Sequence, residues 1–540
     1  MSNNTNLILE VKNLQKHFPI AKSFFGKDIA FLKAVDNVSF KLDKGKTIGV
    51  VGESGCGKTT LGRTILQLYS TTGGKSIYHG YQVTEFCPSY YLKGIEQIKS
   101  LKVQYEALKD QLTACTGEIC YQLDSNITLE KLDSLYYHYV NLAATSTSDT
   151  EKANAEKTVH ALESMKEVLE TASSITGGLI LSDLKVTLPV LKQKITICKE
   201  LKKLKDKEVK LNKLIQNEKT DSEKYNELKV ELTSVLENIS NIKHEVENLS
   251  VKLTELLNEF KELPLFKELE NNFDGGLDLA RLTKTELRSL RTEIQLIFQD
   301  PYSSLPPRMT IGEILCEPVK VHNIVPKDQV YEHVHKVMKM CGLQPQYFDR
   351  YPHEFSGGQR QRICIARALV VNPKLVICDE PVSALDVSIQ AQIINLLKQL
   401  QNELGLTYMF ISHDLSVVKY ITDSIMVMYL GNVMEHGDTD DIFENPLHPY
   451  TKALFSAVPV PDPDAKMNRI ILKGDIPSPA NPPKGCKFHT RCDKCVSACK
   501  VLAPKFIEHS PNHFVACHLY DSEVMDNLSI YDKLLENEEK

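Results

Sequence analysis

The segment Gly52-Glu53-Ser54-Gly55-Cys56-Gly57-Lys58-Thr59-Thr60 decides the fold that we expect for this chain. It follows the apolar run 47–51 and precedes a helical pattern over 61–68, so the motif G-x-x-x-x-G-K-[ST] stands in its strand–loop–helix context. Glycines there let backbone N–H groups turn inward onto phosphate oxygens, and the helix N-terminus adds a favourable potential. We therefore predict that residues 52–60, the phosphate loop, bind nucleotide, with Lys58 at the β- and γ-phosphates and the Thr59 hydroxyl on Mg²⁺.

A second apolar run, residues 375–378, ends in two carboxylates, Asp379 and Glu380. Phosphoryl transfer needs acidic groups at such a place, because its catalysis consists of positioning and charge stabilisation. Asp379 is expected to face Mg²⁺, directly or through water, and Glu380 to orient and deprotonate the attacking water. Adjacent acids at a strand end are otherwise typical of a turn or a helix cap, but the phosphate loop favours the catalytic interpretation.

Four more motifs follow in order along the chain. They are Gln299 within IFQDP, Ser356-Gly357-Gly358-Gln359 after Phe355, Asp386 at the end of SALD, and His413 within ISHD. Together with the phosphate loop and the paired acids, they resemble the Q-loop, signature, D-loop and switch histidine of an ATP-binding-cassette (ABC) ATPase. The resemblance implies an α/β P-loop NTPase fold with a RecA-like core, an antiparallel β subdomain and an α-helical signature subdomain.

The resemblance also implies roles in ATP hydrolysis. Gln299 would contact Mg²⁺ or the lytic water and sense a membrane partner, and His413 would hold the γ-phosphate and keep the water placed. Phe18 stands where the family more often has an adenine-stacking tyrosine, and packing in the core is the alternative for this ring. The implied cofactors are ATP and Mg²⁺, with Thr59, Gln299 and Asp379 at the metal.

A dimer is implied by the same resemblance. Ser356, Gly357 and Gly358 would clamp the γ-phosphate of nucleotide held by the other subunit, with Gln359 in the same ATP-binding motif, and Asp386 would link the two sites. One chain would thus supply half of each composite site.

Three segments narrow the resemblance: FQDPYSSL (298–305), DEPVSALDV (379–387) and NPLHPY (445–450). They resemble the ATPase subunits of oligopeptide and dipeptide importers, most closely the F-type subunit of the oligopeptide system. Pro306-Pro307-Arg308 departs from the Asn-Pro-Arg that is usual there. The resemblance implies ATP hydrolysis coupled to peptide import, a second ATPase subunit in a heterodimer, two transmembrane permease subunits and, indirectly, an extracytoplasmic peptide-binding protein.

Residues 81–272 differ in kind from the rest of the chain. They hold 25 lysines, no arginine and 31 acidic residues, so their formal charge equals the −6 of the whole chain. A weak apolar series over 201–215 and a polar break over 216–223 predict an antiparallel helical hairpin, with a long amphipathic helix on another element as the alternative. In the second half, apolar side chains recur at alternating spacings of four and three, the seam of a coiled coil: Leu228, Leu232, Val235, Ile239, Ile242, Val246, Leu249, Leu253, Leu256, Phe260 and Leu263.

The expected division is an ABC core over 1–80 and 273–460, a helical or coiled-coil insertion over 81–272, and a C-terminal extension over 461–540. Chromosome-maintenance ATPases of the SMC type also carry a coiled coil inside a cassette, and they are the alternative function. Their coil interrupts the cassette beyond the Q-loop, whereas this insertion precedes Gln299, which favours transport. A translation-associated ABC protein is a further alternative, but it would have two cassettes in one chain, and only one is present here.

Four cysteines of the C-terminal extension form a candidate metal site. Cys486, Cys492, Cys499 and Cys517 have gaps of five, six and seventeen residues. Four thiolates suit a [4Fe–4S] cluster, which the family resemblance also implies for such cysteines. Zinc is the competitor, because tetrahedral thiolate sites suit it too, and ordinary reduced cysteines are the third alternative.

Composition excludes several classes of protein. Hydrophobic residues make up 42% and charged residues 25% of the 540 residues, which excludes wholesale disorder. The net charge of −6 argues against a protein that coats nucleic acid, and no nucleic-acid partner is expected. No run of about 18 apolar residues is present, and the N-terminus lacks the plan of a signal peptide. We therefore expect a cytosolic protein, and the resemblance to importer ATPases implies a peripheral location on the cytoplasmic side of the cell membrane.

Overall fold

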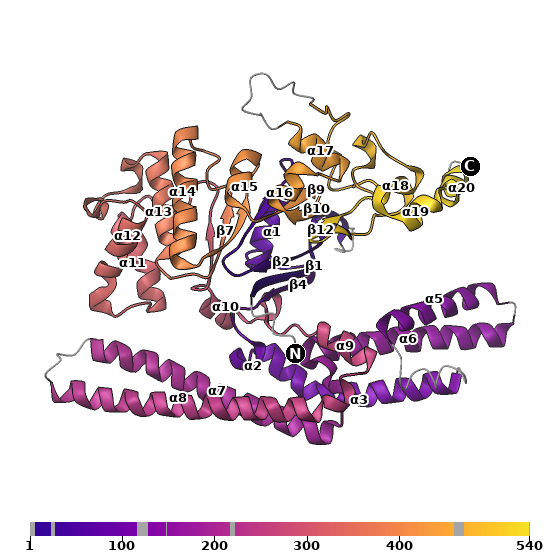
Figure 1. Cartoon of the computed structure of the whole chain (residues 1–540), viewed down its shortest axis with the longest axis horizontal. Coiled ribbons are helices and arrows are strands. Elements are labelled where there is room, and N and C mark those ends of the chain that lie inside the picture. Colours follow the sequence, from indigo (N-terminus) through magenta and orange to yellow (C-terminus); the bar gives the residue numbers. More distant parts are fainter. Residues whose placement is uncertain are drawn as a thin grey trace. The chain divides into compact units, whose positions relative to one another are not determined.

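The computed structural model describes residues 6–22, 28–115, 128–146, 148–216, 222–457 and 469–538. The chain divides into two compact units, one formed by residues 4–80 and 287–540 and the other by residues 1–3 and 81–286. We call them the core unit and the helical unit, and Figure 1 labels the elements of each.

An eight-stranded sheet forms the centre of the core unit, in the order β11-β12-β10-β9-β3-β8-β7-β6. The strands from β9 to β6 are parallel to their neighbours, and the three at the other edge pair antiparallel. Every residue of β3, β7 and β8 is buried, which explains why these segments are continuous apolar runs. The bounds are β3 Thr47–Val51, β6 Ile294–Ile297, β7 Leu375–Asp379, β8 Thr407–Ile411, β9 Ser424–Tyr429, β10 Asn432–Asp438, β11 Ile507–Ser510 and β12 His513–Val515.

Helices pack around this sheet and form one large apolar core with it. Three of them, α11, α12 and α13, contact one another and form the helical part of the core unit. The bounds are α1 Lys58–Ile65, α10 Lys284–Leu290 at the division between the units, α11 Ile311–His322, α12 Val330–Met340, α13 Gly357–Leu369, α14 Val387–Leu404, α15 Leu415–Ile421, α16 Thr439–Glu444, α17 Pro449–Phe455, α18 Ser497–Val501, α19 Ser522–Asp526 and α20 Leu528–Glu538.

A second, antiparallel sheet of the core unit contains β2, β1 and β4 in that order. Its strands are β1 Leu7–Lys22, β2 Asp28–Asp43 and β4 Gly73–Tyr78. The segments 7–11 and 34–40, which have strand-like sequences, lie within β1 and β2. The mixed sheet and this antiparallel sheet are consistent with the RecA-like core and the antiparallel β subdomain expected from the sequence.

The helical unit consists almost entirely of long helices. Its elements are α2 Val83–Phe86, α3 Ser89–Cys115, α5 Leu129–Thr145, α6 Asp149–Thr176, α7 Leu184–Gln216, α8 Glu223–Leu256, α9 Pro264–Asn271 and the short β5 Leu277–Asp278. α6 packs against both α3 and α5, with Leu162, Met165 and Leu169 among its buried side chains. The first half of the insertion is therefore helical too, and the buried positions of α6 at Thr158, Leu162, Met165 and Leu169 recur at spacings of four and three.

α7 and α8 lie side by side as an antiparallel pair (Figure 1). Leu201 and Leu211 of α7 pack with Val235 and Ile239 of α8 in a small apolar cluster. The residues 217–221, within the predicted tip of the hairpin, lie outside the described residues.

α8 is shorter than its apolar series. It ends at Leu256, Phe260 lies in a separate 3₁₀ turn, and Pro264 occupies the first turn of α9. Proline disfavours the helical conformation of the preceding residue, and Leu263 has an extended backbone. The seam therefore stops about two turns before the sequence pattern does. Among the described residues, no helix has the length and apolarity needed to cross a membrane.

Candidate active site

The phosphate loop connects β3 to α1 in the core unit. β3 lies between β9 and β8, so the loop leaves the carboxyl end of a central, fully buried strand. Gly57 precedes the first residue of α1 with φ of 104°, and a Cβ there would lie 2.0 Å from the carbonyl oxygen of Ala34. Only glycine fits this left-handed position and this close approach. The sequence thus places Lys58 at the start of a helix whose N-terminus faces the loop.

Lys58 is held inside the loop by backbone carbonyls. Its ammonium group donates hydrogen bonds to the oxygens of Gly52 at 2.8 Å and Glu53 at 3.1 Å, and the residue is 6% exposed. Ser54 and Gly55 are exposed at the tip of the loop. The loop therefore presents an exposed tip to solvent, with a buried cation beneath it.

Of the three residues predicted at Mg²⁺, Thr59 and Asp379 contact each other, whereas Gln299 is hydrogen-bonded to Glu380. The Thr59 hydroxyl donates to Asp379 Oδ1 at 2.7 Å, which brings the loop and the end of β7 together. Asp379 Oδ2 is buried and has no hydrogen-bond partner within the described residues, although a guanidinium nitrogen of Arg63 lies 3.6 Å away. Burial raises the pKa of the Asp379 carboxyl above its ordinary value. A hydroxyl beside an unsatisfied carboxylate oxygen is a donor set that fits Mg²⁺.

Glu380, Gln299 and His413 converge at the ends of three strands. The Gln299 amide donates to Glu380 Oε2 at 2.8 Å, and His413 Nδ1 lies 3.4 Å from the same oxygen. These residues follow β7, β6 and β8, which are parallel neighbours, so their carboxyl ends meet at one edge of the sheet. Glu380 has φ of 45°, and a strained backbone at a non-glycine residue is typical of functional sites.

The signature and the D-loop begin two helices of the core unit. Ser356 and Gln359 form a capping box at the start of α13, with Ser356 Oγ accepting the Gln359 N–H and Gln359 Oε1 accepting the Ser356 N–H. Asp386 caps α14 by accepting hydrogen bonds from the Ser388 hydroxyl and the Ile389 N–H. The Gln359 side chain is therefore engaged within its own helix.

Parts of the signature remain accessible. Ser356 and Gly357 are exposed, whereas Gly358 is buried and a Cβ there would lie 2.5 Å from the Ile389 side chain. The hydrogen bonds described for Ser356 and Asp386 run within α13 and α14, and none of these reaches the phosphate loop.

Phe18 lies in β1 and is half-buried. Its ring meets Tyr69 edge-on at 5.5 Å, and the Lys16 ammonium lies 4.8 Å from the centre of the ring. Lys16 also donates to the Ser70 carbonyl oxygen at 2.7 Å. The Phe18 ring therefore contacts neighbouring side chains but keeps part of its surface exposed to solvent.

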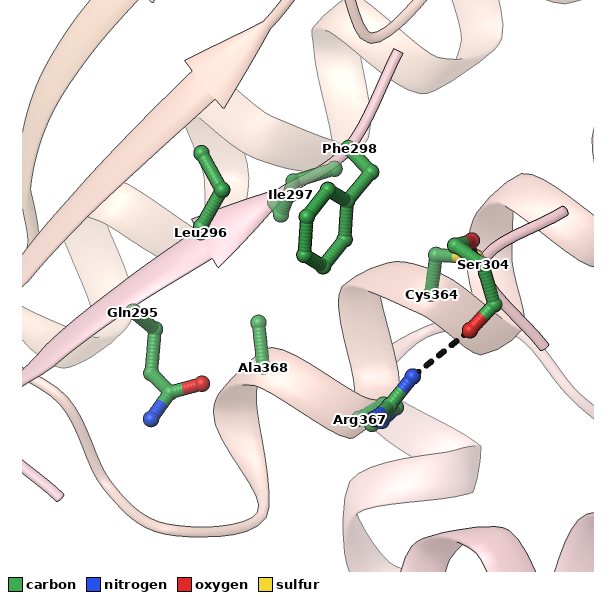
Figure 2. Close-up of a pocket in the computed structure, with 8 residues that line it drawn as sticks. All are labelled: Gln295, Leu296, Ile297, Phe298, Ser304, Cys364, Arg367 and Ala368. Carbon is green, nitrogen blue, oxygen red and sulfur yellow. Dashed lines mark hydrogen bonds between the residues drawn. The ribbon is translucent and has the colours of Figure 1, made fainter. Parts of the chain in front are cut away.

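A small cavity lies next to the Q-loop, between β6 and α13 (Figure 2). Its volume is about 70 Å³. Arg367 crosses it to donate to the Ser304 carbonyl oxygen at 2.7 Å, as the dashed line in Figure 2 shows. A cavity of this size holds water molecules and not a nucleotide. Its lining is Gln295, Leu296, Ile297, Phe298, Ser304, Cys364, Arg367 and Ala368.

The four C-terminal cysteines are brought near one another. Cys486, Cys499 and Cys517 are buried and Cys492 is half-buried. Burial, together with the nearby thiols of the other three cysteines, raises the pKa of the Cys486 thiol to about 12. Within the part of the chain that the structure describes, however, no three His, Cys, Asp or Glu side chains are arranged to hold a metal ion. The thiols as they stand do not fit a cluster.

Two residues that the sequence analysis missed contact Glu53 of the phosphate loop. The Tyr450 hydroxyl accepts the Glu53 N–H at 2.9 Å, and Arg491 pairs with the Glu53 carboxylate at 2.7 Å. Tyr450 lies within the segment NPLHPY, which marked the family, whereas no local pattern marks Arg491. Because each contact joins residues far apart along the chain, local sequence patterns do not reveal it.

Comparison with known proteins identifies the family. The chain matches the family described as "ABC transporter" over residues 35–179 and 264–383, and "Oligopeptide/dipeptide transporter, C-terminal region" over residues 434–499. It is similar to the oligopeptide transport ATP-binding protein AppF of Bacillus subtilis, with 56% identity over 248 residues, covering 45% of this chain and 75% of the relative. The oligopeptide transport ATP-binding protein OppF of Escherichia coli is 56% identical over 245 residues, covering 45% and 73%.

These relatives do not favour the SMC-type alternative. The matched residues include the phosphate loop, the Q-loop, the signature and the paired acids at the end of β7. The chain therefore belongs to the ABC transporter ATPases, in the group of ATP-binding subunits that carry the C-terminal region of oligopeptide/dipeptide transporters.

Proposed function

We propose that this chain binds and hydrolyses ATP to drive the import of oligopeptides or dipeptides through separate membrane subunits. The observation that carries the proposal is the joint placement of Gln299, Glu380 and His413 at one sheet edge, with Thr59 on Asp379. These are the parts that phosphoryl transfer to water requires. The peptide-transport names of the relatives support the coupling to import.

In the proposed reaction, Lys58 and the N–H groups of the phosphate loop bind the phosphates of ATP. Thr59 and Asp379 would hold Mg²⁺, which supplies positive charge at the β- and γ-phosphate oxygens. Glu380 orients the attacking water and accepts its proton, while Gln299 and His413 keep the carboxylate and the water in place. Phe18 would pack on the adenine, because its ring is only half-buried.

The chain would work as one of two ATPase subunits. The exposed Ser356 and Gly357 suit a surface that clamps nucleotide on a partner, and Asp386 at the start of α14 would connect the two sites. We place the dimer, a heterodimer with a second ABC ATPase subunit, against two permease subunits on the cytoplasmic face of the membrane. An extracytoplasmic peptide-binding protein would deliver the peptide without contacting this chain.

The helical unit would be a module separate from the cassette, with α7 and α8 self-paired as an antiparallel coiled coil. The apolar cluster of Leu201, Leu211, Val235 and Ile239 along their contact supports this proposal. The unit's compactness supports its separateness.

A [4Fe–4S] cluster on Cys486, Cys492, Cys499 and Cys517 is supported only by the nearness of the four thiols. Because they do not form a ligand set as they stand, the side chains would have to reorient. Anaerobic purification with iron and sulfide analysis tests this, since a colourless, iron-free protein would exclude the cluster. Zinc analysis of the same sample tests the competing metal.

Reconstitution tests the transport function. The chain, its partner ATPase and the two permease subunits would be placed in lipid vesicles with the peptide-binding protein and defined peptides. We expect peptide uptake to require ATP, and Lys58→Ala to remove ATP binding. A chain that hydrolyses ATP but neither co-purifies with permease subunits nor supports uptake would contradict the proposal.

A further inference from the structure

Arg491 of the C-terminal extension contacts the phosphate loop. Its guanidinium group donates to both carboxylate oxygens of Glu53, from NH1 to Oε2 at 2.7 Å and from NH2 to Oε1 at 3.1 Å. The Arg491 side chain is 8% exposed and that of Glu53 is 24% exposed. A two-pronged pair that is largely shielded from water is the strong, geometrically specific kind of ion pair.

Arg491 is fixed in this position by its own segment. Its N–H donates to the Phe488 carbonyl oxygen at 3.0 Å, and the Phe488 ring is buried against Tyr429 and Tyr450, each at 5.3 Å between ring centres. A guanidinium nitrogen of Arg491 also lies 3.4 Å from the Tyr429 hydroxyl. The guanidinium is therefore positioned by the aromatic anchor of its segment and by the Tyr429 hydroxyl as well as by Glu53.

The same segment is attached at a second point near the loop. The Lys487 ammonium donates to Asp36 Oδ2 at 2.9 Å and to the Leu430 carbonyl oxygen at 3.2 Å. The next residue after Leu430, Gly431, donates its N–H to the Cys56 carbonyl oxygen of the phosphate loop at 2.9 Å. The extension therefore braces the loop at Glu53 directly and near Cys56 through one intermediary.

The negative charge of Glu53 would repel the phosphates of ATP, and the positive charge of Arg491 compensates it. A carboxylate in a loop that must hold a polyphosphate repels the ligand, and this repulsion is stronger in a partly buried site than in bulk water. Arg491 neutralises the carboxylate, and its two-pronged contact also directs the Glu53 side chain toward the extension. The Glu53 N–H is held by Tyr450 at the same time, so both side chain and backbone of this residue are fixed.

We propose that Arg491 is a positioning residue for the nucleotide site, and that the C-terminal extension completes the phosphate loop of its own subunit by neutralising Glu53. This inference rests on the proposed role of the loop in binding ATP. It predicts that the extension contributes to ATP affinity without touching ATP.

The test measures the affinity of the purified full-length chain for a fluorescent ATP analogue. Arg491→Ala is expected to weaken binding about tenfold, since it leaves an unpaired carboxylate in the loop. Glu53→Gln in the same chain removes that carboxylate, so the double variant is expected to regain affinity to within about threefold of wild type. Arg491→Lys, which keeps the charge without the planar fork, is expected to lie between. The matched control is Arg469→Ala, because Arg469 is an exposed arginine of the same extension.

The salt dependence of the affinity is a second measurement, and a purely structural role of Arg491 would not change it. The affinity ratio of wild type to Arg491→Ala is expected to shrink in high salt, because screening weakens the repulsion by Glu53. Equal affinity in Arg491→Ala and Arg469→Ala would overturn the proposal. So would a double variant as weak as Arg491→Ala, since the arginine would then act by packing. A folded wild-type chain that fails to bind the analogue would instead contradict the proposed function, and this inference with it.

Discussion

The side-chain amide of Gln299 and the carboxylate of Glu380 are joined by a hydrogen bond of 2.8 Å between residues 81 positions apart. His413 Nδ1 lies 3.4 Å from the same carboxylate oxygen. One oxygen of the proposed general base is thus fixed from two neighbouring strand ends, and the second remains available to a water. This arrangement makes Glu380 the residue on which hydrolysis should depend most.

Glu380→Gln is expected to lower the rate of ATP hydrolysis about 10²–10⁴-fold, the usual contribution of a general base. Glutamine keeps the size of the side chain but cannot accept the water proton. ATP binding and ATP-dependent dimerisation are expected to persist, because the phosphate loop is unchanged. Phosphate release and light scattering on the same protein measure the two properties.

The matched control for this variant is Glu444→Gln, because Glu444 is exposed at the end of α16. It makes the same chemical change far from the strand ends. Normal turnover in Glu380→Gln would remove Glu380 from its proposed role.

Asp379→Asn is expected to remove the effect of Mg²⁺ on ATP affinity. The native carboxylate has one oxygen on Thr59 and one that is buried without a hydrogen-bond partner among the described residues, and asparagine cannot offer a cation the same charge. We expect the variant to bind ATP equally in Mg²⁺ and in EDTA, whereas wild type binds more tightly with Mg²⁺. Titration calorimetry in the two buffers measures this, with exposed Asp440 as the site of a control Asp→Asn change.

The separate parts of this site were predictable from the sequence, and their contacts were not. The strand–loop–helix pattern located β3, Lys58 and α1, and the apolar run 375–378 located β7. These are local patterns with a period or a fixed spacing. The pairing of Glu53 with Arg491 joins residues 438 positions apart, and it depends on tertiary contacts such as the packing of Phe488 against Tyr429 and Tyr450.

His448 makes the stability of the core unit depend on pH. Its Nδ1 accepts the Tyr450 N–H at 3.0 Å at the start of α17, and burial lowers the pKa of the imidazole to about 4. Below the unfolded pKa of about 6.5, the unfolded chain takes up a proton that the folded chain refuses. Stability is therefore present at neutral pH and is lost as the pH falls from about 6.5 toward 4.

This one residue is expected to lower the free energy of unfolding of the core unit by about 2 kcal/mol between pH 8 and pH 5. His448→Asn keeps an acceptor for the Tyr450 N–H and removes the titration, so its stability should fall less over the same interval. Urea unfolding followed by tyrosine fluorescence at the two pH values gives the comparison. Equal pH dependence in the variant and in wild type would contradict this account.

In the insertion, apolar periodicity predicts the contact of α8 with α7 but not the residue at which α8 ends. The series from Leu228 to Ile242 matches the contact of α8 with α7, because a regular seam needs only local spacing. Beyond Leu256 the same spacing continues through Phe260 and Leu263, but Pro264 starts a new helix there. In the first half of the insertion, α6 contacts α3, α5 and α9, and its buried positions Thr158, Leu162, Met165 and Leu169 also recur at spacings of four and three.

Deleting residues 81–272 is expected to leave ATP binding within about threefold of wild type, a difference of less than 1 kcal/mol. The two ends of the deleted segment lie close together, because the Val83 N–H donates to the Gly275 carbonyl oxygen at 2.9 Å. A short connection can therefore replace the unit, and a shorter loop lowers the entropy cost of closure. The core unit keeps the apolar core that the sheet and its helices form.

Fluorescent-ATP binding and circular dichroism on the deletion variant measure affinity and folding together. Lys58→Ala in the same background is the control, since it should abolish the signal. A folded deletion variant without ATP binding would show that the helical unit belongs to the nucleotide site.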